Sequence, residues 1–195
     1  MPKIAIFTIV FLLIIIGGFA YFLFQEKMPE FLQSPQMPIN NAEIKKEIVK
    51  TDFSSISQNF LFSAKIPAGF KAEYQPFLNT INLYNPNLQG SNNTEKSQIY
   101  ITYFKAGRFL TLNTVNITLQ EPKIVAGREA ILYEIAKKPE FPDFVGQPEW
   151  RNFKHKALDV RFSAENPTYF YSFSYNPILP ESVFNEFIDS LELYQ

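Results

Sequence analysis

Apolar and polar residues alternate with a period of two along most of the chain beyond residue 60. Successive side chains of a strand point to opposite faces of a sheet, so this alternation predicts half-buried β-strands. Gln98–Ala106 carries bulky side chains on both faces, which predicts a strand in the middle of the sheet. Ala126 and Gly127 separate two alternating stretches and predict a tight hairpin. The alternating stretches are 60–66, 70–75, 80–84, 98–106, 115–120, 131–135, 158–164 and 169–175.

Near the C-terminus the spacing of apolar residues becomes helical. Pro180 suits the first turn of a helix, and Glu181 favours the positive end of the helix dipole. The apolar face of this predicted helix is formed by Val183, Phe184, Phe187, Ile188 and Leu191. We therefore expect an α+β fold in which a single antiparallel β-sheet of about six to eight strands is covered by a C-terminal amphipathic helix.

The N-terminal segment Ile4–Phe24 contains no charged residue. As a helix it would rise ~1.5 Å per residue and reach roughly 31 Å, about the thickness of the hydrocarbon core of a bilayer. A lone segment in lipid satisfies its backbone hydrogen bonds only as a helix, so Ile4–Phe24 predicts one transmembrane helix. Lys3 puts positive charge on the short flank, which predicts a cytoplasmic N-terminus. We expect a single-pass protein of the cell membrane whose remaining chain lies outside.

Other interpretations of this apolar segment remain open. The small residues Gly18 and Ala20 would suit a cleaved signal peptide. The apolar run continues to Phe24, however, and exceeds the usual ~7–15-residue core of such a peptide. The run Phe7–Val10 resembles the start of a type IV pilin, although Phe11 stands where that pattern has Glu. A lipoprotein needs a cysteine to carry its lipid, and the chain has none. The length of the run favours the retained anchor.

Residues 25–59 predict a linker, and residues 60–195 predict a single folded domain. Pro29, Pro35 and Pro38 interrupt regular structure in the first half of this linker. We expect a solvated stalk that lifts the domain away from the membrane.

Composition narrows the classes of function. The formal net charge is −1 and the sequence pI is ≈ 5.9, so no basic surface indicates a nucleic-acid partner. The chain has no cysteine and one histidine, His155, which excludes cysteine-ligated and multi-histidine metal sites. We therefore expect no metal and no cofactor. The 21 phenylalanines and 10 tyrosines suit a β-sheet with an aromatic core.

Three stretches of the chain resemble PsbP-like domains. Phe62–Phe70 (FSAKIPAGF) resembles their opening strand and turn, Ile124–Tyr133 (IVAGREAILY) looks like their mid-domain hairpin, and Phe184–Leu193 (FNEFIDSLEL) is similar to their closing helix. The resemblance covers residues 60–195 and implies an antiparallel sheet flanked by helices. It also implies binding or assembly rather than catalysis, since the family includes an extrinsic photosystem subunit and a Ran-binding import factor. This chain has no recognisable photosystem motif, so a role in photosynthesis is not implied.

The sequence offers few catalytic groups. It has no Gly-x-Ser-x-Gly motif, and His155 is its one side chain with an ordinary pKa near neutrality. Lys154 and Lys156 flank this histidine and predict a lowered pKa, and we expect it to be solvated at a strand edge. At ~3.3 Å per residue, Asp159 lies about 13 Å from His155, too far for a catalytic dyad. Arg161 is expected to form a cross-strand salt bridge.

The segment Lys137–Asn152 matches neither the strand nor the helix pattern. Long irregular segments in a compact domain are often functional, and this one combines aromatic residues with arginine as protein-binding hot spots do. The candidates for partner binding are Phe141, Phe144, Trp150 and Arg151. The alternative is that these aromatic side chains fold back and cover the edge of the sheet.

Together these observations favour a membrane-anchored, extracytoplasmic binding or assembly module that is not an enzyme, with a protein or an envelope component as partner. An envelope hydrolase is one alternative, with Glu140, Asp143 and Glu149 as the loop carboxylates. It requires two acidic groups that face each other and have raised pKa values. A pilin-like structural subunit is the other alternative.

Overall fold

The computed structural model describes residues 50–106, 110–161 and 169–194. The chain divides into two units, Met1–Lys45 and Lys46–Gln195, and all of the described residues belong to the second unit. None of the helices in these described ranges combines the length and the hydropathy that a membrane span requires. The predicted transmembrane segment, Ile4–Phe24, lies outside the described residues.

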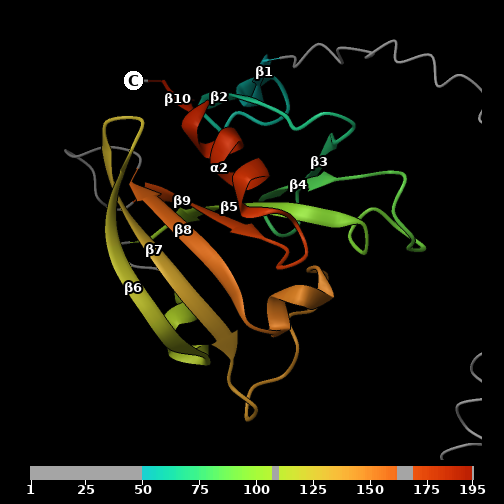
Figure 1. The fold of residues 1–195 in the computed structure, drawn as a ribbon, viewed down its shortest axis with the longest axis vertical. Coiled ribbons are helices and arrows are strands. Elements are labelled where there is room, and N and C mark those ends of the chain that lie inside the picture. The colour runs from blue at the N-terminus through green and yellow to red at the C-terminus, as the bar shows by residue number, and fades with distance from the viewer. Residues whose placement is uncertain (1–49, 107–109, 162–168, 195) are drawn as a thin grey trace, which may run out of the picture. The chain divides into compact units, whose positions relative to one another are not determined.

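A seven-stranded antiparallel sheet forms the centre of the fold (Figure 1). The predicted number of strands is thus confirmed, and β5 lies inside the sheet as expected, between β4 and β9. The long hairpin of β6 and β7 turns at Ala126 and Gly127, also as predicted. In spatial order the strands are β3 (Lys71–Gln75), β4 (Thr80–Tyr84), β5 (Ser97–Lys105), β9 (Tyr169–Tyr175), β8 (His155–Arg161), β7 (Arg128–Lys137) and β6 (Val115–Val125).

A second, three-stranded sheet corrects the prediction of a single sheet. In it β2 (Phe62–Lys65) pairs with β1 (Lys50–Asp52) on one side and with β10 (Glu192–Leu193) on the other. The C-terminal helix α2 (Glu181–Asp189) is confirmed, but it ends before Glu192 and Leu193, which the PsbP-like resemblance placed in the closing helix.

The folded domain also begins earlier than the predicted boundary at residue 60. β1 and the short 3-10 helix η1 (Phe53–Ser55) lie within the predicted linker. Phe53 is completely buried, with its ring stacked on Phe62 at a centroid distance of 4.6 Å and edge-on to Phe187 at 6.3 Å. The end of the predicted linker is therefore part of the hydrophobic core.

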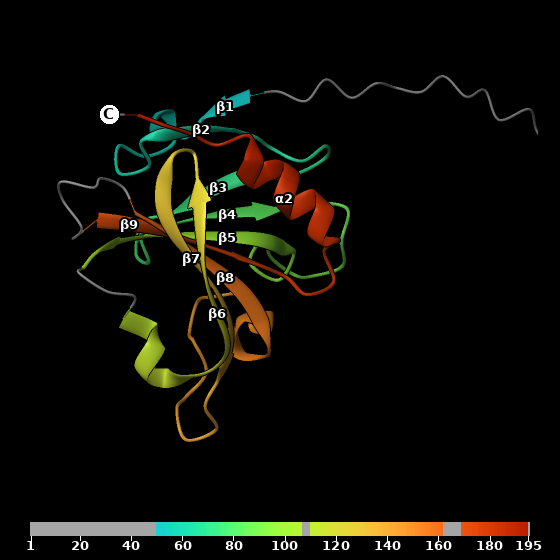
Figure 2. The ribbon, with the colours of Figure 1, turned by 60° about the vertical axis from the view of Figure 1, so that its left-hand side comes forward.

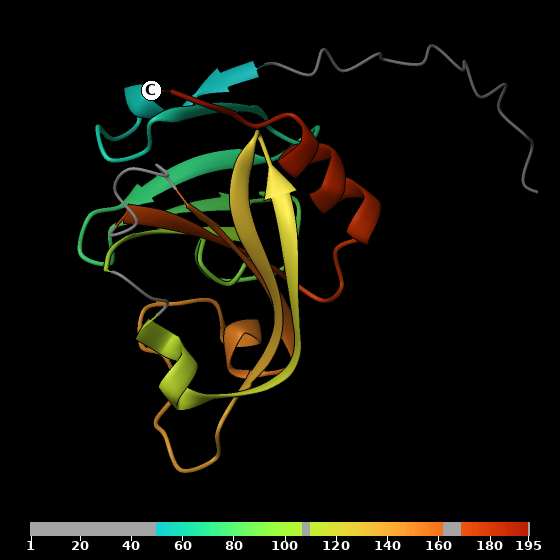
Figure 3. The same cartoon turned by 90° about the vertical axis from the view of Figure 1, so that its left-hand side faces the viewer.

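The small sheet and α2 cover one face of the large sheet (Figure 3). The residues that this face contributes come from alternate positions of the strands, as the sequence pattern predicts. They include Ile81, Leu83, Ile99, Ile101, Leu158, Val160, Tyr171 and Phe173.

The opposite face of the large sheet is covered by irregular chain. The 3-10 helices η2 (Leu110–Thr114) and η3 (Glu149–Asn152) lie on the side away from α2 (Figures 2 and 3). A smaller apolar cluster forms on this face from Val115, Tyr133, Ile135, Ala157 and Phe170. One face of the large sheet is thus apolar, and the other buries both apolar and polar side chains beneath irregular chain.

Candidate functional site

The segment between β7 and β8 contributes aromatic side chains to the second face of the sheet. Phe144 packs against the apolar cluster there, and its backbone N–H donates to Asn152 Oδ1 over 3.0 Å. Trp150 is half-buried: its indole Nε1–H donates to the backbone oxygen of Ser97 over 3.1 Å, and its ring lies edge-on to His155 at 5.5 Å. These two predicted partner-binding residues therefore make contacts within the domain.

Phe141, the third aromatic candidate, is half-buried, and its backbone oxygen accepts a hydrogen bond from Lys137 Nζ over 2.7 Å. The three acidic residues of the hydrolase alternative, Glu140, Asp143 and Glu149, are all exposed. Asp143 pairs with Lys137 at 3.3 Å. The segment thus exposes its acidic residues and turns its aromatic side chains at least partly inward.

Arg151, the fourth candidate, is buried, with 4% of its surface exposed. Its guanidinium lies over the ring of Tyr100, 5.0 Å from the ring centroid, and Nη1 donates to Gln147 Oε1. Within the described residues Arg151 forms no ion pair, and its Nε atom is buried without a hydrogen-bond partner. Burial lowers the pKa of this guanidinium to about 10. Among the residues that the structure describes, the site therefore contains a buried cation without a countercharge.

A row of polar side chains crosses the sheet beneath this segment. Thr80 on β4 pairs with Thr102 on β5, Thr102 pairs with Ser172 on β9, and Ser172 pairs with Asp159 on β8. Alternation places all four on the face away from α2, because their neighbours in sequence belong to the main core. All four are buried. The strand register therefore assembles hydroxyl groups from distant parts of the chain into one layer.

Many polar atoms in and near this layer have no hydrogen-bond partner. The side-chain atoms that are buried and unpartnered within the described residues are Asn82 Oδ1, Ser97 Oγ, Thr102 Oγ1, Arg151 Nε, His155 Nε2, Asp159 Oδ1, Ser172 Oγ and Ser174 Oγ. Buried polar groups are nearly always hydrogen-bonded to protein or water, and each that is not costs free energy. So many in one region indicate a space that water or a ligand completes.

His155 corrects the prediction of a solvated strand-edge residue. It is 3% exposed, and it lies on β8, an inner strand between β7 and β9. Its Nδ1 lies 2.8 Å from the backbone oxygen of Phe153, which only accepts, so Nδ1 carries the proton and Nε2 is an acceptor without a partner. Burial, and secondly the charge of Arg151, lower its pKa to about 4. The direction agrees with the prediction, but the flanking lysines are not the cause.

Asp159 is the buried acid of the layer. Burial raises its pKa to about 6, against the opposing effect of Arg161, whose Nη2 lies 3.1 Å from Asp159 Oδ2. This ion pair joins two residues of one strand, and the predicted cross-strand pair of Arg161 stays a prediction.

A cavity of about 330 Å³ opens between this layer and the segment that covers it. Its polar lining includes Thr80, Thr102, Gln147 and Arg151, and its apolar lining includes Leu78, Phe104 and Phe144. The hydroxyl of Tyr100, which fixes the ring beneath Arg151, donates to Gln75 Oε1 over 3.0 Å and accepts from Thr80 at 3.1 Å. The cavity therefore has a rigid floor, one charged group and a partly apolar wall.

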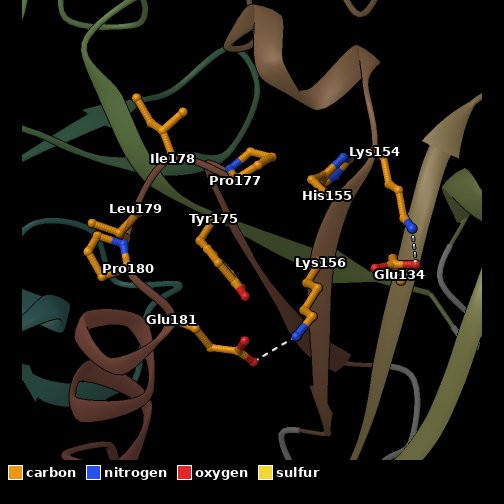
Figure 4. A pocket seen from close by; sticks show the side chains of 10 residues that line it. All are labelled: Glu134, Lys154, His155, Lys156, Tyr175, Pro177, Ile178, Leu179, Pro180 and Glu181. Carbon is orange, nitrogen blue, oxygen red and sulfur yellow. Dashed lines mark hydrogen bonds and ion pairs between the residues drawn. The ribbon is translucent and has the colours of Figure 1, made fainter.

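A second pocket, of about 530 Å³, lies where the ends of β8 and β9 meet the start of α2 (Figure 4). Two ion pairs cross its lining: Lys154 with Glu134 at 2.8 Å, and Lys156 with Glu181 at 2.7 Å. Each lysine already has a carboxylate partner, so this pocket offers a ligand no uncompensated charge. The cavity beside Arg151 is the stronger candidate site.

The described residues include no group of three or more His, Asp or Glu side chains placed to hold a metal ion. Of the four predicted site residues, the structure brings Phe144 and Arg151 to the cavity wall, whereas Phe141 and Trp150 are not in its lining. Sequence reasoning missed Thr80, Thr102 and Gln147. A signal existed in the hydroxyl-bearing positions that alternate with apolar ones in β4, β5 and β9, but their alignment depends on a register that the sequence does not reveal.

No protein-family model matches the chain, and no curated protein matches it. A crystal structure of a protein from Bacteroides thetaiotaomicron VPI-5482 aligns with it at a TM-score of 0.30 and 13% sequence identity, covering 72% of this chain and 47% of that protein. The chain thus spans about half the length of that protein, and a similarity of this degree carries no argument about fold or function.

Proposed function

We propose that the protein is a membrane-anchored, extracytoplasmic binding module that takes a small molecule into the cavity beside Arg151, and that it is not an enzyme. The membrane anchor is Ile4–Phe24 and the binding domain lies outside the cell interior. The resemblance to PsbP-like domains is part of this proposal, because it implies binding or assembly. A protein or an envelope component remains the expected larger partner.

One observation supports the binding role most directly: two of the unpartnered buried polar atoms belong to residues that line the cavity. Thr102 Oγ1 and Arg151 Nε are buried without partners, and both residues line the cavity. Its volume of about 330 Å³ falls within the range of ~300–1,000 Å³ typical of ligand pockets. A bound molecule with matching polar groups would supply hydrogen-bond partners for these two atoms.

The hydrolase alternative receives little support from the same geometry. It needs two carboxyl groups facing each other with raised pKa values. Glu140, Asp143 and Glu149 are exposed. Among the carboxyl groups that the structure describes, the one with a clearly raised pKa belongs to Asp159, which is paired with Arg161. His155, with a pKa of about 4, is a weak base.

The binding proposal is tested on the full chain, purified from its native membranes in mild detergent. After denaturation, mass spectrometry of the released small molecules should find one compound in near-stoichiometric amount. Thr102→Val should lose most of this compound, because the Val side chain has the same shape and no hydroxyl. Thr118→Val, on exposed β6, is the matched control and should retain it. No retained compound, or equal retention by both variants, would contradict the proposal.

The location is tested separately. Protease added to whole cells should remove residues 60–195, and carbonate washing should leave the intact protein with the membranes. Protection in whole cells followed by cleavage after lysis would contradict the proposed orientation. Release by carbonate would contradict the anchor.

A further inference from the structure

We infer that the molecule taken up by this cavity is a small organic acid whose carboxylate pairs with Arg151. This inference rests on the proposed function and specifies the chemistry of its ligand. The starting observation is electrostatic: Arg151, a residue 4% exposed, lines the cavity, and its guanidinium has no ion-pair partner among the described residues. A buried charge without a partner is strongly unfavourable, so a site that keeps one gains from a ligand of opposite charge.

The surroundings of Arg151 leave this charge uncompensated at neutral pH. Its close ionisable neighbours are Tyr100, whose ring lies under the guanidinium, and His155. Burial raises the pKa of Tyr100 and lowers that of His155, so both are neutral near pH 7. Gln147, which accepts the hydrogen bond from Nη1, is neutral as well. Within the described residues, no neighbouring group therefore neutralises the positive charge of the Arg151 guanidinium, and an anionic ligand would do so.

The shape and polarity of the lining favour a carboxylate over a phosphate. A guanidinium presents a planar set of donors that matches the two oxygens of a carboxylate. Thr102 Oγ1, unpartnered and part of the sheet side of the same cavity, supplies a further hydroxyl donor. A single cation balances a monocarboxylate, whereas a doubly charged phosphate would remain half neutralised. Leu78, Phe104 and Phe144 offer an apolar surface for the body of such an acid.

A matched pair of probes tests this inference on the full chain in detergent at pH 7. Benzoate and benzamide share size and shape and differ in charge. Benzoate should bind saturably by calorimetry and raise the unfolding temperature, and benzamide should bind at least about tenfold more weakly, the factor expected from about 1.4 kcal/mol of charge-assisted hydrogen bonding. Arg151→Met should abolish the preference for benzoate, whereas Arg128→Met, at the distant β6–β7 turn, should retain it.

The wild-type comparison does not depend on whether the Arg151 variant folds. Equal affinity for benzoate and benzamide would overturn the inference, as would binding of neither probe or tighter binding of inorganic phosphate. The proposed function has its own readout in the compound that co-purifies from native membranes. If that compound is present but neutral, the binding role stands and the carboxylate assignment falls.

Discussion

The hydroxyl of Tyr171 accepts a hydrogen bond from the backbone N–H of Leu61 over 2.8 Å. The same hydroxyl donates to the backbone oxygen of Asn59 over 2.9 Å. Tyr171 lies on β9 in the middle of the large sheet, and the two backbone groups belong to the chain that leads into β2 of the small sheet. One buried side chain therefore satisfies two backbone groups and ties the sheets together across 110 residues of sequence.

Tyr171→Phe should destabilise the domain by roughly 1–3 kcal/mol, because it leaves a backbone donor and acceptor without this partner. The free energy of unfolding is measured by urea titration of the full chain in detergent, followed by the fluorescence of Trp150, the one tryptophan. Tyr103→Phe is the control, since the Tyr103 hydroxyl makes no hydrogen bond within the described residues and its ring contacts remain. Equal effects of the two changes would contradict this role of Tyr171.

Phe53→Ala should destabilise the domain by about 3–5 kcal/mol, because a fully buried ring in contact with Phe62 and Phe187 leaves a cavity. Phe77→Ala is the matched control: Phe77 is 97% exposed, and its loss should change the free energy of unfolding by no more than about 0.5 kcal/mol. If Phe53 belonged to a solvated linker, as the sequence predicts, its replacement would have no more effect than that of Phe77.

The spacing of apolar residues along the sequence is sufficient to predict a strand or helix whose own side chains form the buried face. The alternation in Gln98–Ala106 predicted an inner strand, and helical spacing after Pro180 predicted α2, because each pattern reflects one face buried against the core. Phe53 and Leu193 were assigned wrongly for the opposite reason. These short elements are stabilised by residues of β2 and α2 that are distant in sequence. The neighbouring sequence therefore does not predict them.

The sequence predicts two residues of the candidate site, Phe144 and Arg151, but not how the site is arranged around the cavity. Arg151 is predicted as a contact for an external partner, because nothing in the sequence around it, with Trp150 before it and Asn152 after it, reveals that it is buried. The two flanking lysines favour a solvated His155, yet in a strand the side chain of His155 points to the face opposite theirs and is buried there. The layer of Thr80, Thr102 and Ser172 depends on strand register, which long-range pairing sets.

Two buried ionisable groups give opposite contributions to the pH dependence of stability. The pKa of Asp159 is about 6 in the folded protein and ordinarily 3.8, so the folded state holds the extra proton between these values, and its stability falls as pH rises from about 4 to 6. The pKa of His155 is about 4 and ordinarily 6.5, so the unfolded state holds the extra proton, and stability rises over the same window. In the wild type the two effects largely cancel.

Replacing one of the two groups at a time should therefore reveal the contribution of the other to the pH dependence of the free energy of unfolding. Relative to wild type, Asp159→Asn should gain stability between pH 4 and 6 by roughly 3 kcal/mol, because a shift of one pKa unit corresponds to about 1.4 kcal/mol. His155→Asn should lose a similar amount over the same range. The free energy of unfolding in urea at pH 4, 5, 6 and 7 measures both. Parallel pH profiles for wild type and both variants would show that these groups do not titrate as buried residues.

Trp150 separates the structural and the partner-binding interpretations of the segment between β7 and β8. Its indole N–H donates to the backbone oxygen of Ser97, which also accepts from Gln98 and Asn176. Trp150→Ala should therefore lower the free energy of unfolding chiefly through lost packing, by roughly 3 kcal/mol. Circular dichroism in urea measures this loss, because the variant lacks the one tryptophan. Val145→Ala, at a site 88% exposed, should leave stability unchanged. Crosslinking in native membranes should then capture a protein partner from position 145 rather than from position 150. A Trp150→Ala protein of normal stability that loses a crosslinked partner would establish the hot-spot interpretation instead, because only an external contact would then account for this side chain.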